Sequence, residues 1–204
     1  TFDDGNTTNL GIDDGILLTT GLASQALGPN NSGSTDFNQP STFHGDPDLA
    51  SISPWPLEDA CILSFDFVPN SDVISVQYVF ASEEYNEYVC SVFNDIFAFF
   101  VNGPAPGGGT YNNENVALIP GTTLPVAINS VNNGTPGSEG TSSNCTSLAY
   151  SSFFVDNTGG TTIEYDGFTV PLTAEVAVIP GQTYTFKFAI SDVSDGLWDS
   201  GVFI

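Results

Sequence analysis

Alternation of apolar and polar residues with a period of two is the feature of this sequence that most restricts its fold. It is clearest at residues 74–80 and 184–190, where large apolar side chains occupy every second position, and it recurs at 63–67 and 170–178. A strand with one face in a core and the other in water has this pattern, because successive side chains point to opposite faces. No segment of ten or more residues carries an apolar stripe of helical period.

Turn-forming residues separate these segments and further apolar runs at 15–19, 96–101, 116–119 and 202–204. Short strands at this spacing, divided by Pro and Gly, predict an all-β fold, which we expect to be a jelly-roll-like antiparallel β-sandwich with long loops. No repeat or shift in composition divides the chain. We therefore expect one domain over residues 1–204, belonging to a longer surface protein.

The charge balance excludes several classes of function. The chain carries 24 Asp and Glu residues against one basic side chain, Lys187, which gives a formal net charge of −23. Nucleic acids and anionic membrane surfaces are recognised by several Lys and Arg residues, so neither is an expected partner. No apolar run approaches the ~20 residues of a membrane helix, and direct membrane insertion is not expected. A fold this acidic repels itself, and a bound cation is one way to offset the charge.

Three cysteines occur in two different settings. Cys90 and Cys145 lie among polar loop residues, whereas Cys61 begins an apolar strand. We expect a disulfide between Cys90 and Cys145, with Cys61 as a free core thiol; three buried thiols are the alternative. A disulfide, together with low lysine and abundant Asn, Gly, Thr and Ser, indicates an extracellular location.

Two groups of carboxylates follow or precede predicted strands, where a sandwich brings its loops together. Hard oxygen ligands at short spacing are what Ca²⁺ coordinates, and solvated acidic loops are the alternative. The expected Ca²⁺ ligands are Glu83, Glu84, Asp95, Asp192, Asp195 and Asp199. A second set of candidate ligands, with weaker support, comprises Asp13, Asp14, Asp46 and Asp48.

The residues needed for most catalytic chemistry are scarce. One histidine, His44, and one lysine leave no triad, no Schiff-base site and no zinc spacing. A glycosidase with paired carboxylates is the one enzyme class that this composition leaves open. We expect that the protein is not an enzyme.

Aromatic residues in loops suggest a second kind of site. Trp55, Tyr85 and Trp198 lie outside the strand alternation, where they are candidates for a sugar-binding platform. Aromatic plugs beneath loops are the alternative.

Two longer motifs stand out, FASEEY at residues 80–85 and FNDIFAFFVNGP at residues 93–104. They resemble the choice-of-anchor L family of bacterial secreted and surface proteins. Shorter similarities follow in family order at 10–21 (LGIDDGILLTTG), 116–121 (VALIPG), 165–169 (YDGFT) and 199–203 (DSGVF). The resemblance implies export, anchoring or assembly at the cell surface within large multidomain proteins, and no assigned enzymatic activity.

These observations predict an extracellular, Ca²⁺-stabilised adhesive or structural module of a bacterial surface protein. A carbohydrate-binding, lectin-like module and a subunit of a surface filament are the alternatives. The expected partners are surface glycans or neighbouring protein subunits, and in the filament case the chain would form a homopolymer by exchange of strands.

Overall fold

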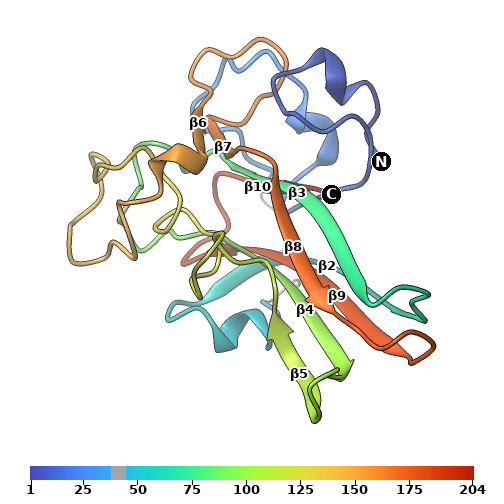
Figure 1. Cartoon of the computed structure of the whole chain (residues 1–204). Coiled ribbons are helices and arrows are strands. Elements are labelled where there is room, and N and C mark those ends of the chain that lie inside the picture. The colour runs from blue at the N-terminus through green and yellow to red at the C-terminus, as the bar shows by residue number, and fades with distance from the viewer. Residues whose placement is uncertain (38–44) are drawn as a thin grey trace.

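Two antiparallel β-sheets face each other in the computed structural model (Figure 1), which describes residues 1–37 and 45–204. The six-stranded sheet has the order β1-β10-β3-β7-β6, with β8 also paired to β3, and the four-stranded sheet has the order β2-β9-β4-β5. The first sheet contains β1 (Leu17–Thr19), β3 (Val73–Ser82), β6 (Phe154–Asp156), β7 (Gly167–Thr169), β8 (Leu172–Ala177) and β10 (Ser200–Phe203). The second contains β2 (Leu57–Phe67), β4 (Ile96–Pro104), β5 (Thr110–Asn115) and β9 (Tyr184–Val193).

The helices among the described residues are four short 3₁₀ turns. None of them is long and apolar enough to cross a membrane. Their bounds are η1 (Gly5–Thr7), η2 (Ala23–Ala26), η3 (Leu49–Ser51) and η4 (Ser151–Phe153).

Burial alternates with a period of two in β8 and in the first halves of β3 and β9, whereas most of β4 and the second halves of β3 and β9 are buried on both faces. In β8, for example, buried and exposed residues alternate without interruption from Leu172 to Ala177. The predicted all-β antiparallel sandwich is therefore confirmed. The strand predicted at 116–119 is wrong: it contributes only an isolated bridge between Leu118 and Pro125, because the turn at Pro120 follows at once. β5 was not predicted, since its polar sequence TYNNEN lacks apolar alternation.

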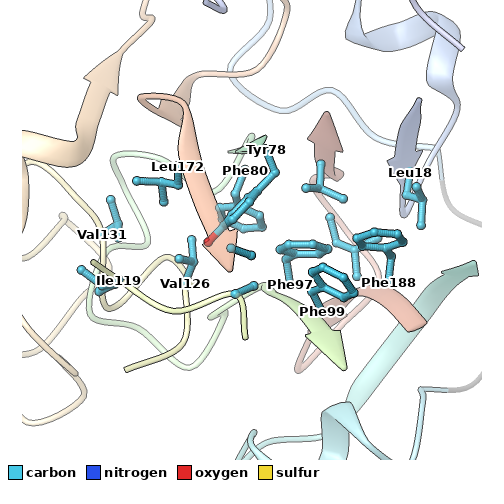
Figure 2. Close-up of a cluster of buried hydrophobic side chains, with 14 of the residues drawn as sticks. Leu18, Tyr78, Phe80, Phe97, Phe99, Ile119, Val126, Val131, Leu172 and Phe188 are labelled. Atoms are coloured by element: carbon cyan, nitrogen blue, oxygen red, sulfur yellow. The ribbon is translucent and has the colours of Figure 1, made fainter. Parts of the chain in front are cut away.

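Aromatic side chains from both sheets meet in the main core (Figure 2). Tyr78 and Phe80 extend from β3, and Phe97 and Phe99 extend from β4 toward them. The rings of Tyr78 and Phe97 have centroids 5.2 Å apart, and those of Phe99 and Phe188 are 4.4 Å apart. Aromatic pairs at such separations add to the stabilisation that apolar burial provides.

The chain's one lysine joins a loop to the outer face of the four-stranded sheet. Lys187 Nζ, on β9, lies 2.8 Å from Asp46 Oδ1 and also forms an ion pair with Asp48. These two aspartates, expected as weaker Ca²⁺ ligands, are instead paired with the ammonium group. The ammonium group of Lys187 is therefore already paired with carboxylates of this loop.

The predicted disulfide between Cys90 and Cys145 is confirmed. It connects the segment after β3 to a long loop across a sequence separation of 55 residues. Cys61 is a free cysteine at the edge of the sandwich, and it is half-buried rather than part of the deep core.

Replacing Cys90 and Cys145 together with Ala is expected to lower the free energy of unfolding by roughly 2–4 kcal/mol, because the cross-link restricts the unfolded chain. Urea unfolding of oxidised wild type, reduced wild type and the double variant measures the loss. Cys61→Ala is the control and should leave the difference between oxidised and reduced protein unchanged. A reduced wild type as stable as the oxidised protein would contradict this role for the cross-link.

Candidate functional site

Five carboxylates from distant parts of the sequence lie at the same end of the sandwich. Asp192 is the penultimate residue of β9. Asp95 directly precedes β4, Asp199 directly precedes β10, and Glu83 and Glu84 directly follow β3. The pairing of Ile96 with Ser191 and of Ser200 with Ser82 brings these positions together. We call Glu83, Glu84, Asp95, Asp192 and Asp199 the carboxylate cluster; each of the five residues is at most 3% exposed.

Asp95 and Asp192 form the deepest part of the cluster. Asp95 Oδ1 accepts a hydrogen bond from the Val193 amide at 2.9 Å, and its Oδ2 accepts one from the Ser200 hydroxyl at 2.7 Å. Neither carboxylate oxygen of Asp192 has a hydrogen-bond partner among the described residues. Burial raises the pKa of Asp95 to about 7, and burial together with the neighbouring Asp95 raises the pKa of Asp192 well above its usual value.

Glu83 lies on the side of the cluster that faces the loop before residue 38. The Thr35 amide donates a 3.3 Å hydrogen bond to Glu83 Oε2, whereas Oε1 has no partner among the described residues. Burial, with the charges of Asp166 and Glu164 nearby, raises the pKa of Glu83 to about 9. The same loop also binds Asp199, since the Phe37 amide donates a 3.1 Å hydrogen bond to Asp199 Oδ2.

Glu84 faces a different neighbourhood from Glu83. Its Oε2 is buried without a partner in the described structure, and burial with the nearby charges of Asp95 and Asp195 raises its pKa to about 11. A cavity of about 90 Å³ adjoins it. The cavity is lined by Glu84, Tyr88, Phe93, Asp195, Leu197 and Trp198.

The other predicted ligands lie outside the buried cluster. Asp195 is half-buried and accepts a hydrogen bond from the Leu197 amide. Asp13 and Asp14 are exposed, and His44 falls outside the described residues.

Sequence reasoning did not identify Glu164 and Asp166 as members of this region. Thr35 donates a hydrogen bond to Glu164 Oε1 at 2.6 Å, and Asn30 donates one to Asp166 Oδ1 at 2.8 Å. The two acids flank Tyr165 far along the sequence from Glu83, so only the fold brings them to this region. Gly21 was also not identified: a Cβ there would lie 1.6 Å from Asp199 Oδ2, so the close approach requires glycine.

Within the ranges 1–37 and 45–204, no group of three or more His, Cys, Asp or Glu side chains is arranged so that it could hold a metal ion. The carboxylates instead approach one another in smaller sets, around Asp95 with Asp192 and around Glu83. Ca²⁺ takes 6–8 oxygen ligands, and backbone carbonyls and waters can supply most of them. A cation would therefore need such additional ligands or a shift of the side chains.

The three predicted aromatic platform residues differ in accessibility. Trp55 is 38% exposed, whereas Tyr85 is fully buried, and its hydroxyl donates a 2.6 Å hydrogen bond to the Val131 carbonyl. Tyr85 is thus part of the core, and its ring is not accessible to a sugar. Trp198 is half-buried against Tyr88, with ring centroids 4.3 Å apart.

In the absence of divalent cations, the free energy of unfolding is expected to fall as the pH rises from about 5 to about 9. The folded-state pKa values of Asp199 (about 6), Asp95 (about 7) and Glu83 (about 9) exceed the roughly 4 of an unfolded carboxyl. The folded state then holds more protons, so this stabilisation is complete below about pH 4 and is lost through the folded-state values.

Urea unfolding in EDTA at pH 5, 7 and 9 measures this dependence. Asp192→Asn removes one buried charge and should flatten it. A stability that stays constant or increases over this range would show that the cluster is solvated rather than buried.

The comparisons with known proteins agree with the sequence motifs. The family model of the choice-of-anchor L domain matches residues 1–204, the whole chain. No curated protein and no solved structure shows significant similarity to it. The motifs FASEEY and FNDIFAFFVNGP supply Glu83, Glu84 and Asp95, so the resemblance includes part of the carboxylate cluster. The chain belongs to the choice-of-anchor L domain family, which implies a secreted or surface protein of a bacterium.

Proposed function

We propose that this chain is an extracellular, Ca²⁺-stabilised structural and adhesive module of a bacterial surface protein. The observation that carries the proposal is the buried Asp192 carboxylate, whose two oxygens have no partner among the described residues. An ionised carboxylate in that position costs several kcal/mol unless a proton or a cation neutralises it. Lys187 already forms ion pairs with Asp46 and Asp48. A bound cation is therefore the expected source of positive charge beside Asp192 at neutral pH.

The position of the cluster explains why a cation would stabilise the whole fold. Asp95 and Asp192 lie at adjacent strands of the four-stranded sheet, whereas Glu83 and Asp199 lie at adjacent strands of the other sheet. Ser200 of β10 donates its hydroxyl to Asp95, which links the two sheets at this end. A cation bound here would offset the mutual repulsion of groups that otherwise separate the sheets.

A non-catalytic role fits the burial of the same groups. Paired carboxylates in a glycosidase flank a cleft that admits a sugar and a water. Asp95 and Asp192 are each 1% exposed, which leaves no path for a glycosidic bond to reach them. This burial disfavours the glycosidase alternative.

Carbohydrate binding is a second candidate, supported by the surroundings of Trp55. This exposed tryptophan borders two surface hollows of about 300 and 200 Å³. Amide side chains of Asn94 and Asn144 line the second hollow, and such groups hydrogen-bond sugar hydroxyls while an aromatic face packs on the ring. Binding to surface glycans on an array, lost in Trp55→Ala with an unchanged melting temperature, tests this role; an identical profile for the variant contradicts it.

Millimolar Ca²⁺ added to the EDTA-treated protein is expected to raise the melting temperature by roughly 5–10 °C at neutral pH. A hundredfold excess over Kd contributes about 2.7 kcal/mol, and each kcal/mol corresponds to about 2–4 °C for a chain of this size. Scanning calorimetry with Ca²⁺, with Mg²⁺ and in EDTA measures the shift.

Two variants make this experiment specific. Asp192→Asn should abolish the Ca²⁺-dependent shift while keeping or raising the melting temperature in EDTA, because it removes an uncompensated buried charge. Glu175→Gln, an exposed acid on β8, is the matched control and should keep the full shift. A wild type without any shift, or a variant Asp192→Asn that retains it, would contradict a structural cation in this cluster.

A further inference from the structure

Three aromatic rings line the cavity of about 90 Å³ that adjoins Glu84. The centroid of the Tyr88 ring lies 4.3 Å from that of Trp198 and 5.2 Å from that of Phe93. The Tyr88 ring is inclined at 72° to the first of these rings and at 83° to the second. Rings that meet at such angles form walls in different directions. We call Tyr88, Phe93 and Trp198 the aromatic corner.

Two carboxylates line the same cavity. Glu84 is 2% exposed, and its Oε2 has no hydrogen-bond partner among the described residues. Asp195 reaches the cavity from the loop between β9 and β10. Two further acids lie beside it, since the Glu139 amide donates a 3.0 Å hydrogen bond to the carbonyl of Glu87, which directly precedes Tyr88. An acidic environment of this kind favours a cationic ligand.

Local contacts hold the walls of the cavity in place. The Tyr88 amide donates a 3.1 Å hydrogen bond to the Glu84 carbonyl, so a single helical turn brings these two side chains to the same side. The disulfide at Cys90 anchors the residues that follow. The Ser194 hydroxyl donates a 2.8 Å hydrogen bond to the Val92 carbonyl, which joins the loop between β9 and β10 to the segment before β4. A site formed in advance loses less conformational freedom when it binds a ligand.

The chemistry of the walls selects the kind of cation. Ca²⁺ needs 6–8 oxygen ligands, whereas most of this lining is aromatic and aliphatic carbon. A primary ammonium group would lose hydrogen bonds to water that ring faces do not replace. A quaternary ammonium group has no N–H donor, and its methyl groups pack against aromatic rings that attract the positive charge. It is therefore the cation that this cavity suits best.

We propose that this cavity binds a quaternary ammonium group, with the aromatic corner around its methyl groups and with Glu84 and Asp195 compensating its charge. The site is additional to the structural cation and the glycan surface proposed above and depends on neither. The chain carries a net charge of −23, and its one lysine is paired with two aspartates. A phosphate beside the ammonium group would be repelled, so the ligand carries a net positive charge, as choline does.

Titration of the protein with choline in EDTA tests the proposal. The chain has two tryptophans, so in the variant Trp55→Phe the tryptophan fluorescence reports on Trp198 alone. Choline is expected to change this fluorescence saturably. Dimethylbutanol, in which carbon replaces the nitrogen of choline, and phosphocholine should each bind at least about tenfold more weakly. No saturable change at tens of millimolar choline, or equal binding of the uncharged analogue, would overturn the proposal.

Two substitutions of Tyr88 test the aromatic corner without a change in net charge. Tyr88→Leu removes one ring, and calorimetric titration should show about tenfold weaker binding of choline. Tyr88→Phe keeps the ring and should keep the affinity. The melting temperature of each variant shows that it is folded. Unchanged affinity in Tyr88→Leu would contradict recognition by the rings.

Substitutions of carboxylates separate this site from the proposed structural cation. Glu84→Gln keeps the shape of the side chain and should weaken choline binding about tenfold, whereas Glu175→Gln, an exposed acid on β8, should leave it unchanged. Asp192→Asn should also keep choline binding, because Asp192 does not line this cavity. Equal losses in Glu84→Gln and Glu175→Gln would show attraction by net charge alone and overturn the proposal.

Discussion

The burial of five carboxylates at one end of the sandwich, away from the chain's one lysine, is the constraint on which the rest of the structure depends. Asp95 and Asp192 lie where the four-stranded sheet meets β10, and Asp95 links the two sheets by accepting a hydrogen bond from the Ser200 hydroxyl. Burial raises the pKa of both carboxyl groups, so their ionised forms are disfavoured at this contact between the sheets. The aromatic core, by contrast, contributes stabilisation that does not depend on pH or ions.

A domain of this kind suits an environment outside the cell. A disulfide connects two loops that follow β3. The chain's one lysine forms an ion pair with the loop after residue 44. The other charged side chains are acidic, and they repel one another. Membership in the choice-of-anchor L family implies a surface or secreted protein. A divalent cation and surface glycans are the ligands that the proposed function assigns to it.

The sandwich was predictable because its strands carry their own burial pattern. The sequences of β3, β8 and β9 alternate over most of their length, and Cys90 and Cys145 lie in polar loops, so the fold class and the disulfide could both be predicted. The strand at 116–119 was wrong, and β5 was missed, because an apolar run can fill a core without pairing and a polar segment can pair without a core. Trp55, Tyr85 and Trp198 looked alike in sequence, yet only the fold buries Tyr85 completely.

The sequence by itself determined that the chain is an acidic, disulfide-linked β-sandwich, since composition and period-two alternation are local properties. It also drew attention to carboxylates at strand ends, five of which the structure buries at one end of the sandwich. Only the tertiary structure decided which carboxylates are buried, that Glu83 and Glu84 face different neighbours, and that Glu164 and Asp166 join them. Burial and pairing depend on strand register between segments a hundred residues apart, and no local pattern encodes that register.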